Sequence, residues 1–245
     1  MNASSFGGGK RVHVVLIYQS LLGIYGDRGN ATVIMRRLAW RGYDPLLSVV
    51  EPGDPLPTDG DVYLLGGGED AAQISAVKAL KADGTIFRAV DRGAAVFAVC
   101  AGYQILGNSF TVGDNDAVTE GLGLLDVTTT RGPKRAVGEL LGRWIGHSGE
   151  EQWLTGFENH GGYTRLGPGA EPMMRVEVGI GNCADGTDGA QNGTVLAIYP
   201  HGPALARNPA LADHVLETAL KTELPALDEP EIAELRRQRI TAARR

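Results

Sequence analysis

Cys100 is the residue of this sequence whose surroundings best fit covalent chemistry. It follows the apolar run 94–99 and precedes the small residues Ala101 and Gly102, a pattern that predicts a sharp turn from a buried strand into a helix. At such a helix start a thiolate meets the positive end of the helix macrodipole, and the amide of Ala101 would face an oxyanion formed during attack on a carbonyl. A single cysteine is more often an inert, buried apolar residue, so the assignment needs support from other residues.

Two other strand ends supply the groups that a nucleophilic thiol requires. The glycines 66–68 follow the predicted strand 61–65, and their amides can approach an oxyanion closely because no side chain intervenes. A tight turn is the simpler interpretation of these glycines, whereas a P-loop is excluded because no lysine followed by serine or threonine comes after them. His201 follows the predicted strand 195–199 and could take the thiol proton. Parallel strands end at one edge of a sheet, so these residues are expected to meet there.

The four other histidines and the second cysteine fit this chemistry less well. His160 lies in a polar, glycine-flanked segment and is the alternative base. His13 falls inside a predicted strand, His147 in a Gly/Ser-rich loop and His214 on a predicted helix, so each is expected to be structural or exposed. Cys183 lies in a polar loop with no base beside it in the sequence and is expected to be inert.

Short apolar runs alternate with helical patterns around these residues, as expected for strands buried on both faces of a parallel sheet. The predicted strands cover residues 12–18, 46–50, 61–65, 94–99 and 195–199. The predicted helices are 31–41 with Asn30 as its N-cap, a segment with Ile74, Val77 and Leu80 on one side, 86–92, and 208–221. This alternation predicts an α/β fold, an open and mostly parallel sheet with helices on both faces.

The middle of the chain, residues 108–195, is rich in Gly, Thr and Asn and has a different pattern. Short strands are predicted at 123–129, 136–141, 153–157 and 175–178, forming a mixed or antiparallel sheet within the same domain. We therefore expect a flexible tail at residues 1–11, one domain at 12–224 and a charged helical tail at 225–245.

Composition excludes several classes of protein. The chain has 245 residues, of which 43% are hydrophobic and 21% charged, so it can bury a core and is too apolar to be disordered. Its net charge of −6 disfavours a general nucleic-acid binder. Two cysteines cannot build a disulfide framework, which favours a reducing cytosol. No apolar stretch approaches the roughly 18 residues of a membrane span, and no His/Cys spacing is typical of a metal site; we expect a cytoplasmic protein.

Several motifs together resemble a known enzyme family. Residues 66–70 with Gln73, residues 99–104 and residues 199–203 are similar to motifs of class I glutamine amidotransferases, and more narrowly of the branch that contains the cobyric acid synthase glutaminase domains. Residues 25–30, 120–123 and 157–162 resemble the GatD type, the glutaminase subunits of lipid II isoglutaminyl synthase. The resemblance runs from about residue 12 to residue 220 and therefore covers nearly the whole chain.

The resemblance implies a flavodoxin-like glutaminase fold and a role for each matching residue. Cys100 would attack the side-chain amide of glutamine, and His201 would act as base and then as acid. The oxyanion would lie between the amides of Ala101 and Gly67. The substrate would contact Gln104, Gly68 and Arg135. Gln104 could equally serve packing, and Arg131 and Lys134 compete with Arg135 for the α-carboxylate, which calls for a cation.

Pro203 departs from the pattern of the broad class, in which a glutamate two positions after the histidine orients the imidazole. Either another acid of this chain takes that role, or none does, or a partner supplies it across an interface. Family branches with the His-Gly-Pro form resemble the last case, so the resemblance favours an acid from the partner.

The resemblance also implies a partner. This would be a Mur-ligase-like subunit of the MurT type, forming a heterodimer, binding ATP and Mg²⁺ and amidating the D-glutamate of lipid II, while the glutaminase itself needs no cofactor. The alternatives are a component of a cobyric-acid-type amidotransferase, a catalytically silent regulatory subunit of the same fold, and a thiol-peptidase-like hydrolase.

Overall fold

The computed structural model describes residues 5–23, 26–113, 116–146 and 152–245. Over these residues a central sheet has the strand order β11-β12-β4-β3-β1-β2, and every neighbouring pair is parallel except β11 with β12. This order corresponds to the flavodoxin-like arrangement that was predicted. The antiparallel edge strand β11 is an addition to it. The strands are β1 (Arg11–Ile17), β2 (Asp44–Val50), β3 (Val62–Leu65), β4 (Ala95–Val99), β11 (Ala190–Asn192) and β12 (Val195–Ile198).

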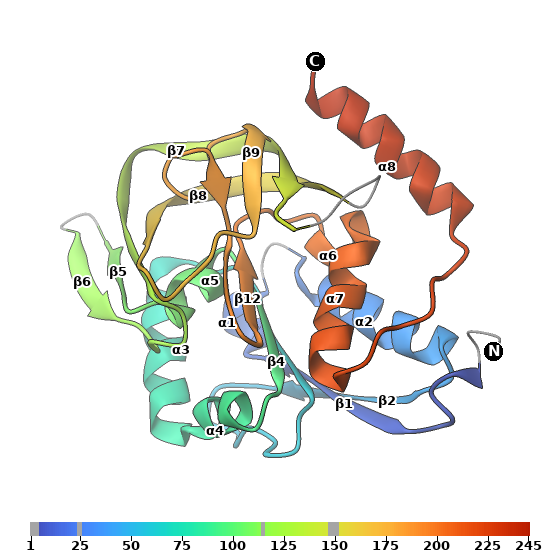
Figure 1. Ribbon diagram of the computed structural model, residues 1–245. Coiled ribbons are helices and arrows are strands. Elements are labelled where there is room, and N and C mark those ends of the chain that lie inside the picture. Colours follow the sequence, from blue (N-terminus) through green and yellow to red (C-terminus); the bar gives the residue numbers. More distant parts are fainter. Residues whose placement is uncertain (1–4, 24–25, 114–115, 147–151) are drawn as a thin grey trace.

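Helices cover both faces of this sheet (Figure 1). Right-handed crossovers place the long helix between β1 and β2 and the helices between β3 and β4 on opposite faces, because these two connections lead toward opposite edges of the sheet. One group contains α2 (Arg28–Trp40), α6 (Ala204–Arg207) and α7 (Pro209–Leu220), which contact one another. The other contains α1 (Gln19–Leu22), α3 (Asp70–Asp83), α4 (Thr85–Asp91) and α5 (Ala101–Leu106). None of the described helices is long and apolar enough to cross a membrane.

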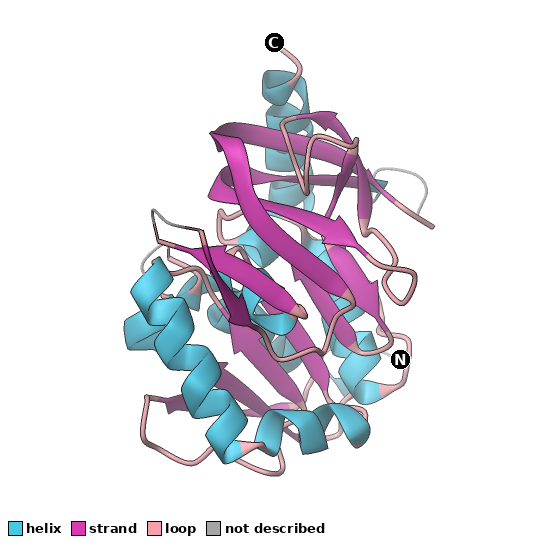
Figure 2. Ribbon diagram, turned by 90° about the vertical axis from the view of Figure 1, so that its left-hand side faces the viewer, coloured by secondary structure: helices cyan, strands magenta, loops and turns pink. Residues whose placement is uncertain are grey.

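The middle of the chain forms a second sheet, seen in the upper half of Figure 2. Its path runs β10-β9-β7-β5-β6, with β8 also paired to β7. The predicted strand 136–141 and the last three residues of the predicted strand 123–129 belong to one long strand, because β7 begins at Val127 and continues through a register shift between Arg131 and Ala136. Residues 123–126 form no strand. The strands are β5 (Ser109–Val112), β6 (Ala117–Glu120), β7 (Val127–Trp144), β8 (Trp153–Leu166), β9 (Met174–Val178) and β10 (Thr187–Asp188).

The prediction that Asn30 caps a helix is wrong. Helix α2 begins at Arg28, so Asn30 lies in its first turn rather than before it. The buried amide oxygen of Asn30 accepts a hydrogen bond from the backbone of Leu205 at 2.9 Å. A short polar side chain near a helix start can bond a neighbouring segment instead of its own helix, and here Asn30 joins α2 to α6.

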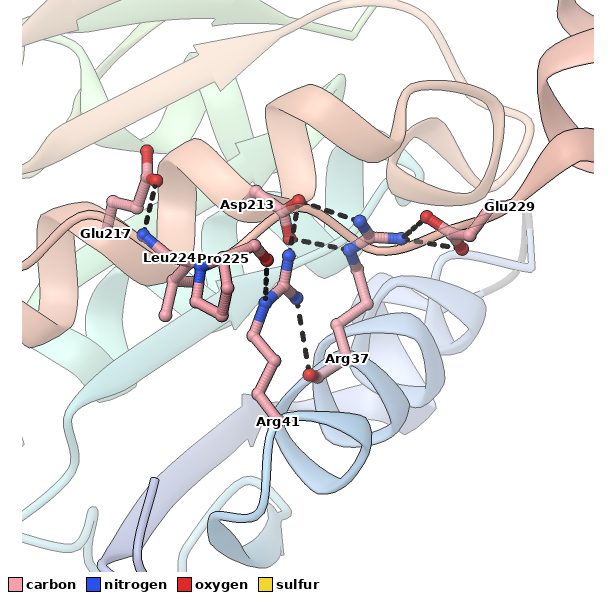
Figure 3. A network of polar contacts seen from close by, with 7 residues as sticks. All are labelled: Arg37, Arg41, Asp213, Glu217, Leu224, Pro225 and Glu229. Atoms are coloured by element: carbon pink, nitrogen blue, oxygen red, sulfur yellow. Dashed lines mark hydrogen bonds and ion pairs between the residues drawn. The ribbon is translucent and has the colours of Figure 1, made fainter. Parts of the chain in front are cut away.

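A network of buried charges anchors the C-terminal segment to α2 (Figure 3). Arg37 and Arg41 point from α2 to Asp213 on α7, with contacts of 2.6 to 2.8 Å. Arg37 also contacts Glu229 at 2.7 Å, and Arg41 donates to the carbonyl oxygen of Pro225 at 2.9 Å. Both guanidinium groups are almost fully buried, so these acceptors compensate charges that would otherwise be costly to bury.

Helix α8 (Pro230–Ala243) follows this network and buries none of its residues completely. Arg236 nevertheless donates to the carbonyl oxygens of Arg207 and Trp153, at 2.6 and 2.8 Å. Arg244 stacks over the Trp153 ring at 4.4 Å and contacts Glu177. The charged C-terminal segment is thus helical at residues 230–243, and its cations hold it against the second sheet.

Candidate active site

Four parallel strands bring the candidate site together at one edge of the central sheet. Cys100 directly follows β4, and His201 follows β12 after two further residues. The glycines 66–68 follow β3, and the loop that contains Asp27 lies between β1 and α2. This edge includes the place between β1 and β3 where the strand order reverses, which is the usual site of ligand binding in open α/β sheets.

The turn at Cys100 has the geometry that its sequence predicts. β4 ends at Val99 and α5 begins at Ala101, so Cys100 alone makes the turn, with φ 54° and ψ −108°. This is a sparsely populated conformation for a residue other than glycine, and such conformations concentrate at functional sites. Gly102 fits closely against the next strand, because a Cβ there would lie 2.9 Å from the Cβ of Leu65.

His201 is buried beside Cys100 and held by its neighbours. Its backbone exchanges two hydrogen bonds with Phe157, of 2.9 and 3.0 Å. Its Nδ1 lies 3.2 Å from a carboxylate oxygen of Asp27. Burial lowers the pKa of the imidazole, but hydrogen bonds to Asp27 and to the Cys100 side chain outweigh this and raise the pKa from 6.5 to about 10. A histidine in this position can hold the proton that a nucleophilic thiol must give up.

Asp27 is the site residue that we did not single out from the sequence. It is 2% exposed, and its second oxygen accepts a hydrogen bond from the amide of Gly67 at 2.7 Å. Residues 25–30 contribute to the family resemblance, and Tyr25 of this segment lies outside the described residues. The available signal was an acid in the loop after the first buried strand, at the edge that carries Cys100 and His201.

A cavity of about 370 Å³ opens beside Cys100. It brings together most of the residues that were predicted to hold substrate, namely Gly68, Gln104, Arg135 and the competing Arg131, and it is also lined by Glu69, Asp70, Ala71, Gln73, Thr111, Asn159, His160, Gly161 and Gly162. Ala101, Gly67 and His201 are buried, and none of them is among the described residues that line this cavity.

The two arginines in the cavity differ in their partners. Arg131 forms an ion pair of 2.6 Å with Asp116. Arg135 donates to Asn159, a neutral side chain, at 2.8 Å. Asp116 already balances the positive charge of Arg131. Asn159 is neutral, so the full charge of Arg135 is available to an anion. This contrast favours Arg135 over Arg131 for a substrate carboxylate; the exposed Lys134 does not line the cavity in the described structure.

His160 has a structural setting distinct from that of His201. One ring nitrogen lies 2.8 Å from the carbonyl oxygen of Gly162, and the other 3.4 Å from a carboxylate oxygen of Glu158. Its ring stacks on Tyr199 with centroids 3.7 Å apart. Tyr199 in turn accepts a hydrogen bond of 3.2 Å from Gln104, which fixes that side chain beside the cavity. His160 therefore forms part of the cavity wall, whereas the imidazole whose pKa Cys100 helps to raise is that of His201.

The remaining candidates lie outside this arrangement. His13 contacts Ser48 and Asp59, and His214 packs edge-on against Trp144. Burial and a hydrogen bond to Asp185 raise the pKa of the Cys183 thiol to about 11, which disfavours a reactive thiolate. His147 lies outside the described residues. Among the residues that the structure describes, no three His, Cys, Asp or Glu side chains are grouped as metal ligands.

Comparisons with known proteins identify the family. Residues 13–209 match the CobB/CobQ-like glutamine amidotransferase domain. The GatD subunit of lipid II isoglutaminyl synthase from Staphylococcus aureus is 31% identical over 85% of each chain, and that of Streptococcus pneumoniae 29% identical over 91% of this chain and 90% of the other. Cobyric acid synthase from Methylobacterium nodulans is 34% identical over 72% of this chain, which spans 37% of that protein.

Solved structures agree on the fold. A glutamine amidotransferase crystal structure matches with a TM-score of 0.58 and 22% identity, over 84% of this chain and 98% of the other. A glutamine amidotransferase from Thermotoga maritima matches with a TM-score of 0.55 and 16% identity, over 95% and 93%. With the match that extends over residues 13–209, these similarities show that the chain belongs to the CobB/CobQ-like family of glutamine amidotransferases.

Proposed function

We propose that this chain is the glutaminase subunit of a two-subunit amidotransferase. It hydrolyses L-glutamine and passes ammonia to a Mur-ligase-like partner of the MurT type, which amidates the D-glutamate of lipid II. The observation that carries the activity is the contact between Cys100 and a buried His201 beside a cavity that Cys100 lines. The similarity to GatD subunits over most of both chains supports the partner and the acceptor.

The proposed reaction needs one thiol, one imidazole and one water molecule. The sulfur of Cys100 attacks the side-chain amide carbon of glutamine, and the amide of Ala101 faces the resulting oxyanion. Protonated His201 gives its proton to the leaving nitrogen, so that ammonia departs and a glutamyl thioester remains. His201 then takes a proton from water, which attacks the thioester, releases glutamate and leaves the thiol restored. No cofactor takes part in these steps; ATP and Mg²⁺ belong to the partner.

The cavity carries charges that complement an amino acid. Arg135 supplies a cation for the α-carboxylate, and Glu69 and Asp70 supply anions for the α-ammonium group. Gln73 also lines the cavity and is 5% exposed; its amide oxygen has no hydrogen-bond partner among the described residues. A buried acceptor without a partner is costly, and a substrate ammonium group would satisfy it.

Ammonia release from glutamine tests the proposal. We would compare wild type, Cys100→Ala and the control Cys183→Ala, each alone and co-purified with the Mur-ligase-like partner. We expect release from wild type and Cys183→Ala in the complex and a loss of at least 10³-fold in Cys100→Ala, as is typical for removal of a nucleophile. Release that survives Cys100→Ala, or its absence from the wild-type complex, would refute the glutaminase assignment.

The cobyric acid synthases support a second candidate acceptor, because the Methylobacterium enzyme is 34% identical to this chain over 72% of its length. The chain spans 37% of the Methylobacterium protein, so a complete enzyme of that type would need further parts. Supplying the complex with either a lipid II analogue or a cobyrinic acid substrate, each with ATP, distinguishes the two. Amidation of the corrinoid alone would overturn the lipid II assignment.

A further inference from the structure

Gln104 is the polar cavity residue that follows the nucleophile along α5. It lies one helical turn after Cys100, lines the cavity and is 6% exposed. Its Nε2 donates to the hydroxyl of Tyr199 at 3.2 Å, whereas its Oε1 bonds none of the described residues. A carboxamide that is fixed through its nitrogen presents its oxygen as a hydrogen-bond acceptor. A nearly buried acceptor without a partner is costly, so this oxygen needs an N–H from a ligand in the cavity.

A chain of buried hydroxyl groups holds Tyr199 in this contact. The Tyr199 hydroxyl lies 2.6 Å from Oγ1 of Thr164, which lies 2.7 Å from Oγ1 of Thr129. Each hydroxyl carries one hydrogen, so a Tyr199 oxygen that accepts from Gln104 gives its own hydrogen to Thr164. The two threonines pair across β7 and β8. The second sheet therefore fixes the orientation of a side chain that belongs to the helix of the nucleophile.

The ring of Tyr199 is held as firmly as its hydroxyl. The His160 ring stacks on it, with centroids 3.7 Å apart and 12° between the planes. Nδ1 of His160 donates to the carbonyl oxygen of Gly162 at 2.8 Å, because a carbonyl oxygen can only accept. Nε2 lies 3.4 Å from Glu158, a carboxylate that two backbone amides hold at 2.7 and 2.9 Å. These contacts limit the ways in which either ring could turn.

Gly162 shows that this part of the wall is shaped around Gln104. A Cβ on Gly162 would overlap Nε2 of Gln104 and would lie 2.7 Å from Cγ2 of Thr129. Only a glycine leaves room for the carboxamide between the two segments. The polar segment 158–162 therefore encloses Gln104 rather than supplying a base to the thiol.

We propose that Tyr199 is a positioning residue of this site: held by His160 and Thr164, it keeps the carboxamide oxygen of Gln104 directed at the side-chain amide N–H of the substrate glutamine. The inference rests on the proposed function. It explains a preference for amide over acid, because the side-chain carboxylate of glutamate has no N–H and would place two acceptors against each other. Gln104 would thus favour the binding of substrate without favouring that of the product.

Tyr199→Phe tests this role, because phenylalanine keeps the ring that stacks on His160 and loses only the hydroxyl. The matched control is Tyr63→Phe, which removes a buried hydroxyl that donates to the carbonyl oxygen of Pro57, before β3 rather than after it. In the complex with the ligase partner, we expect Tyr199→Phe to raise KM for glutamine about 3- to 10-fold and to leave kcat within about 2-fold, as for loss of one hydrogen bond. The control should change neither value.

Inhibition by glutamate and a double mutant separate positioning from general structure. Tyr199→Phe should leave the inhibition constant of glutamate unchanged, whereas damage to the whole cavity would weaken glutamine and glutamate together and would overturn the inference. In a Gln104→Ala background, Tyr199→Phe should leave KM unchanged, because its effect acts through Gln104. An equal rise of KM in both backgrounds would overturn the inference as well.

A second pair of variants applies where Tyr199→Phe fails to fold. Thr164→Val removes the hydroxyl that accepts from Tyr199, and Thr164→Ser keeps it. We expect KM to rise in the valine variant and to stay within about 2-fold of wild type in the serine variant. Equal KM values in the two variants would contradict a role for the hydroxyl chain and overturn the inference.

Two outcomes distinguish this inference from the proposed function. If the wild-type complex releases ammonia and Gln104→Ala leaves KM unchanged, the inference is overturned while the Cys100-dependent glutaminase stands. If the wild-type complex releases no ammonia, the proposed function fails, and protection of Cys100 from iodoacetamide by glutamine then reports on binding. Protection that Tyr199→Phe weakens would support the inference. Protection that is absent from wild type, or unchanged in Tyr199→Phe, would overturn it.

Discussion

Replacement of Asp213 by alanine should destabilise the protein more than any exposed ion pair could. Asp213 accepts three charged hydrogen bonds, two from Arg37 and one from Arg41, between 2.6 and 2.8 Å. Its side chain is 20% exposed, whereas those of the two arginines are 4% and 1% exposed. The substitution therefore removes a partly screened acid and leaves two buried cations behind.

The magnitude follows from what each arginine retains. Arg37 keeps Glu229, and Arg41 keeps the carbonyl oxygens of Pro225 and Arg37, so neither cation is left without acceptors. Breaking a buried ion pair typically costs about 3–5 kcal/mol. Retained partners and the partial exposure of Asp213 place the expected loss in the free energy of unfolding at about 3 kcal/mol. For a chain of this length that lowers Tm by roughly 6–12 °C.

Urea unfolding of wild type, Asp213→Ala and the control Asp44→Ala would measure this loss. Asp44 pairs with Arg11 at 2.9 Å, but their side chains are 53% and 70% exposed, and such pairs contribute about 0–1 kcal/mol. A loss below about 1 kcal/mol in Asp213→Ala, equal to that of the control, would refute the argument that buried charges in this network need Asp213.

Three further predictions concern the site. The pKa of His201 is raised from 6.5 to about 10, so the imidazole keeps its proton below about pH 10 and loses it above. The kcat should therefore fall as the pH rises through about 10, and a fall near pH 7 would contradict this expectation. Arg135→Ala should raise KM for glutamine about 10-fold or more, because a hydrogen bond to a charged group contributes about 1.5–3 kcal/mol; iodoacetamide should still modify Cys100 in this variant. An unchanged KM in Arg135→Ala together with a raised KM in Arg131→Ala would assign the binding of the substrate carboxylate to Arg131 instead. Gly102→Ala should reduce kcat and Tm together, because its Cβ would lie 3.0 Å from the carbonyl oxygen of Gly66; wild-type values of both would show that the turn tolerates a methyl group.

The central sheet could be predicted from the sequence because its signals are local. The buried strands β1, β3, β4 and β12 are short apolar runs, and strands of this kind are covered by helices on both faces. The second sheet was less predictable. Its strands pair mainly with each other across long hairpins, and residues 131–136 of β7 look like a loop because the strand shifts register there. Register depends on pairing partners that the sequence does not name.

The site was predictable to the extent that each residue lies at a strand end. Cys100 and the glycines 66–68 follow strands directly, so knowledge of the sheet is enough to bring them together. Asp27 lies ten residues after β1, beyond α1, and no periodicity shows that its loop folds back to His201. The mistaken capping role of Asn30 has the same origin, since its partner Leu205 is 175 residues away.

The interface of α2 with α6 and α7, here called the seam, sets the distance between Asp27 and His201. Asp27 immediately precedes α2, and His201 shortly precedes α6 and α7, so the contact between them depends on how α2 packs against α6 and α7. Asn30 bonds Leu205 across this seam near the site, and the buried ion pairs of Asp213 join the same elements farther along α2. The Asn30 hydrogen bond and the Asp213 ion pairs are independent contacts. Loss of the Asp213 ion pairs, which lie farther from the site, should therefore lower the stability of the fold before it changes the geometry of the site. Below its Tm, Asp213→Ala should therefore retain the kcat pH profile of the wild type. A shift of its alkaline limb would show instead that the packing of the whole seam positions the imidazole.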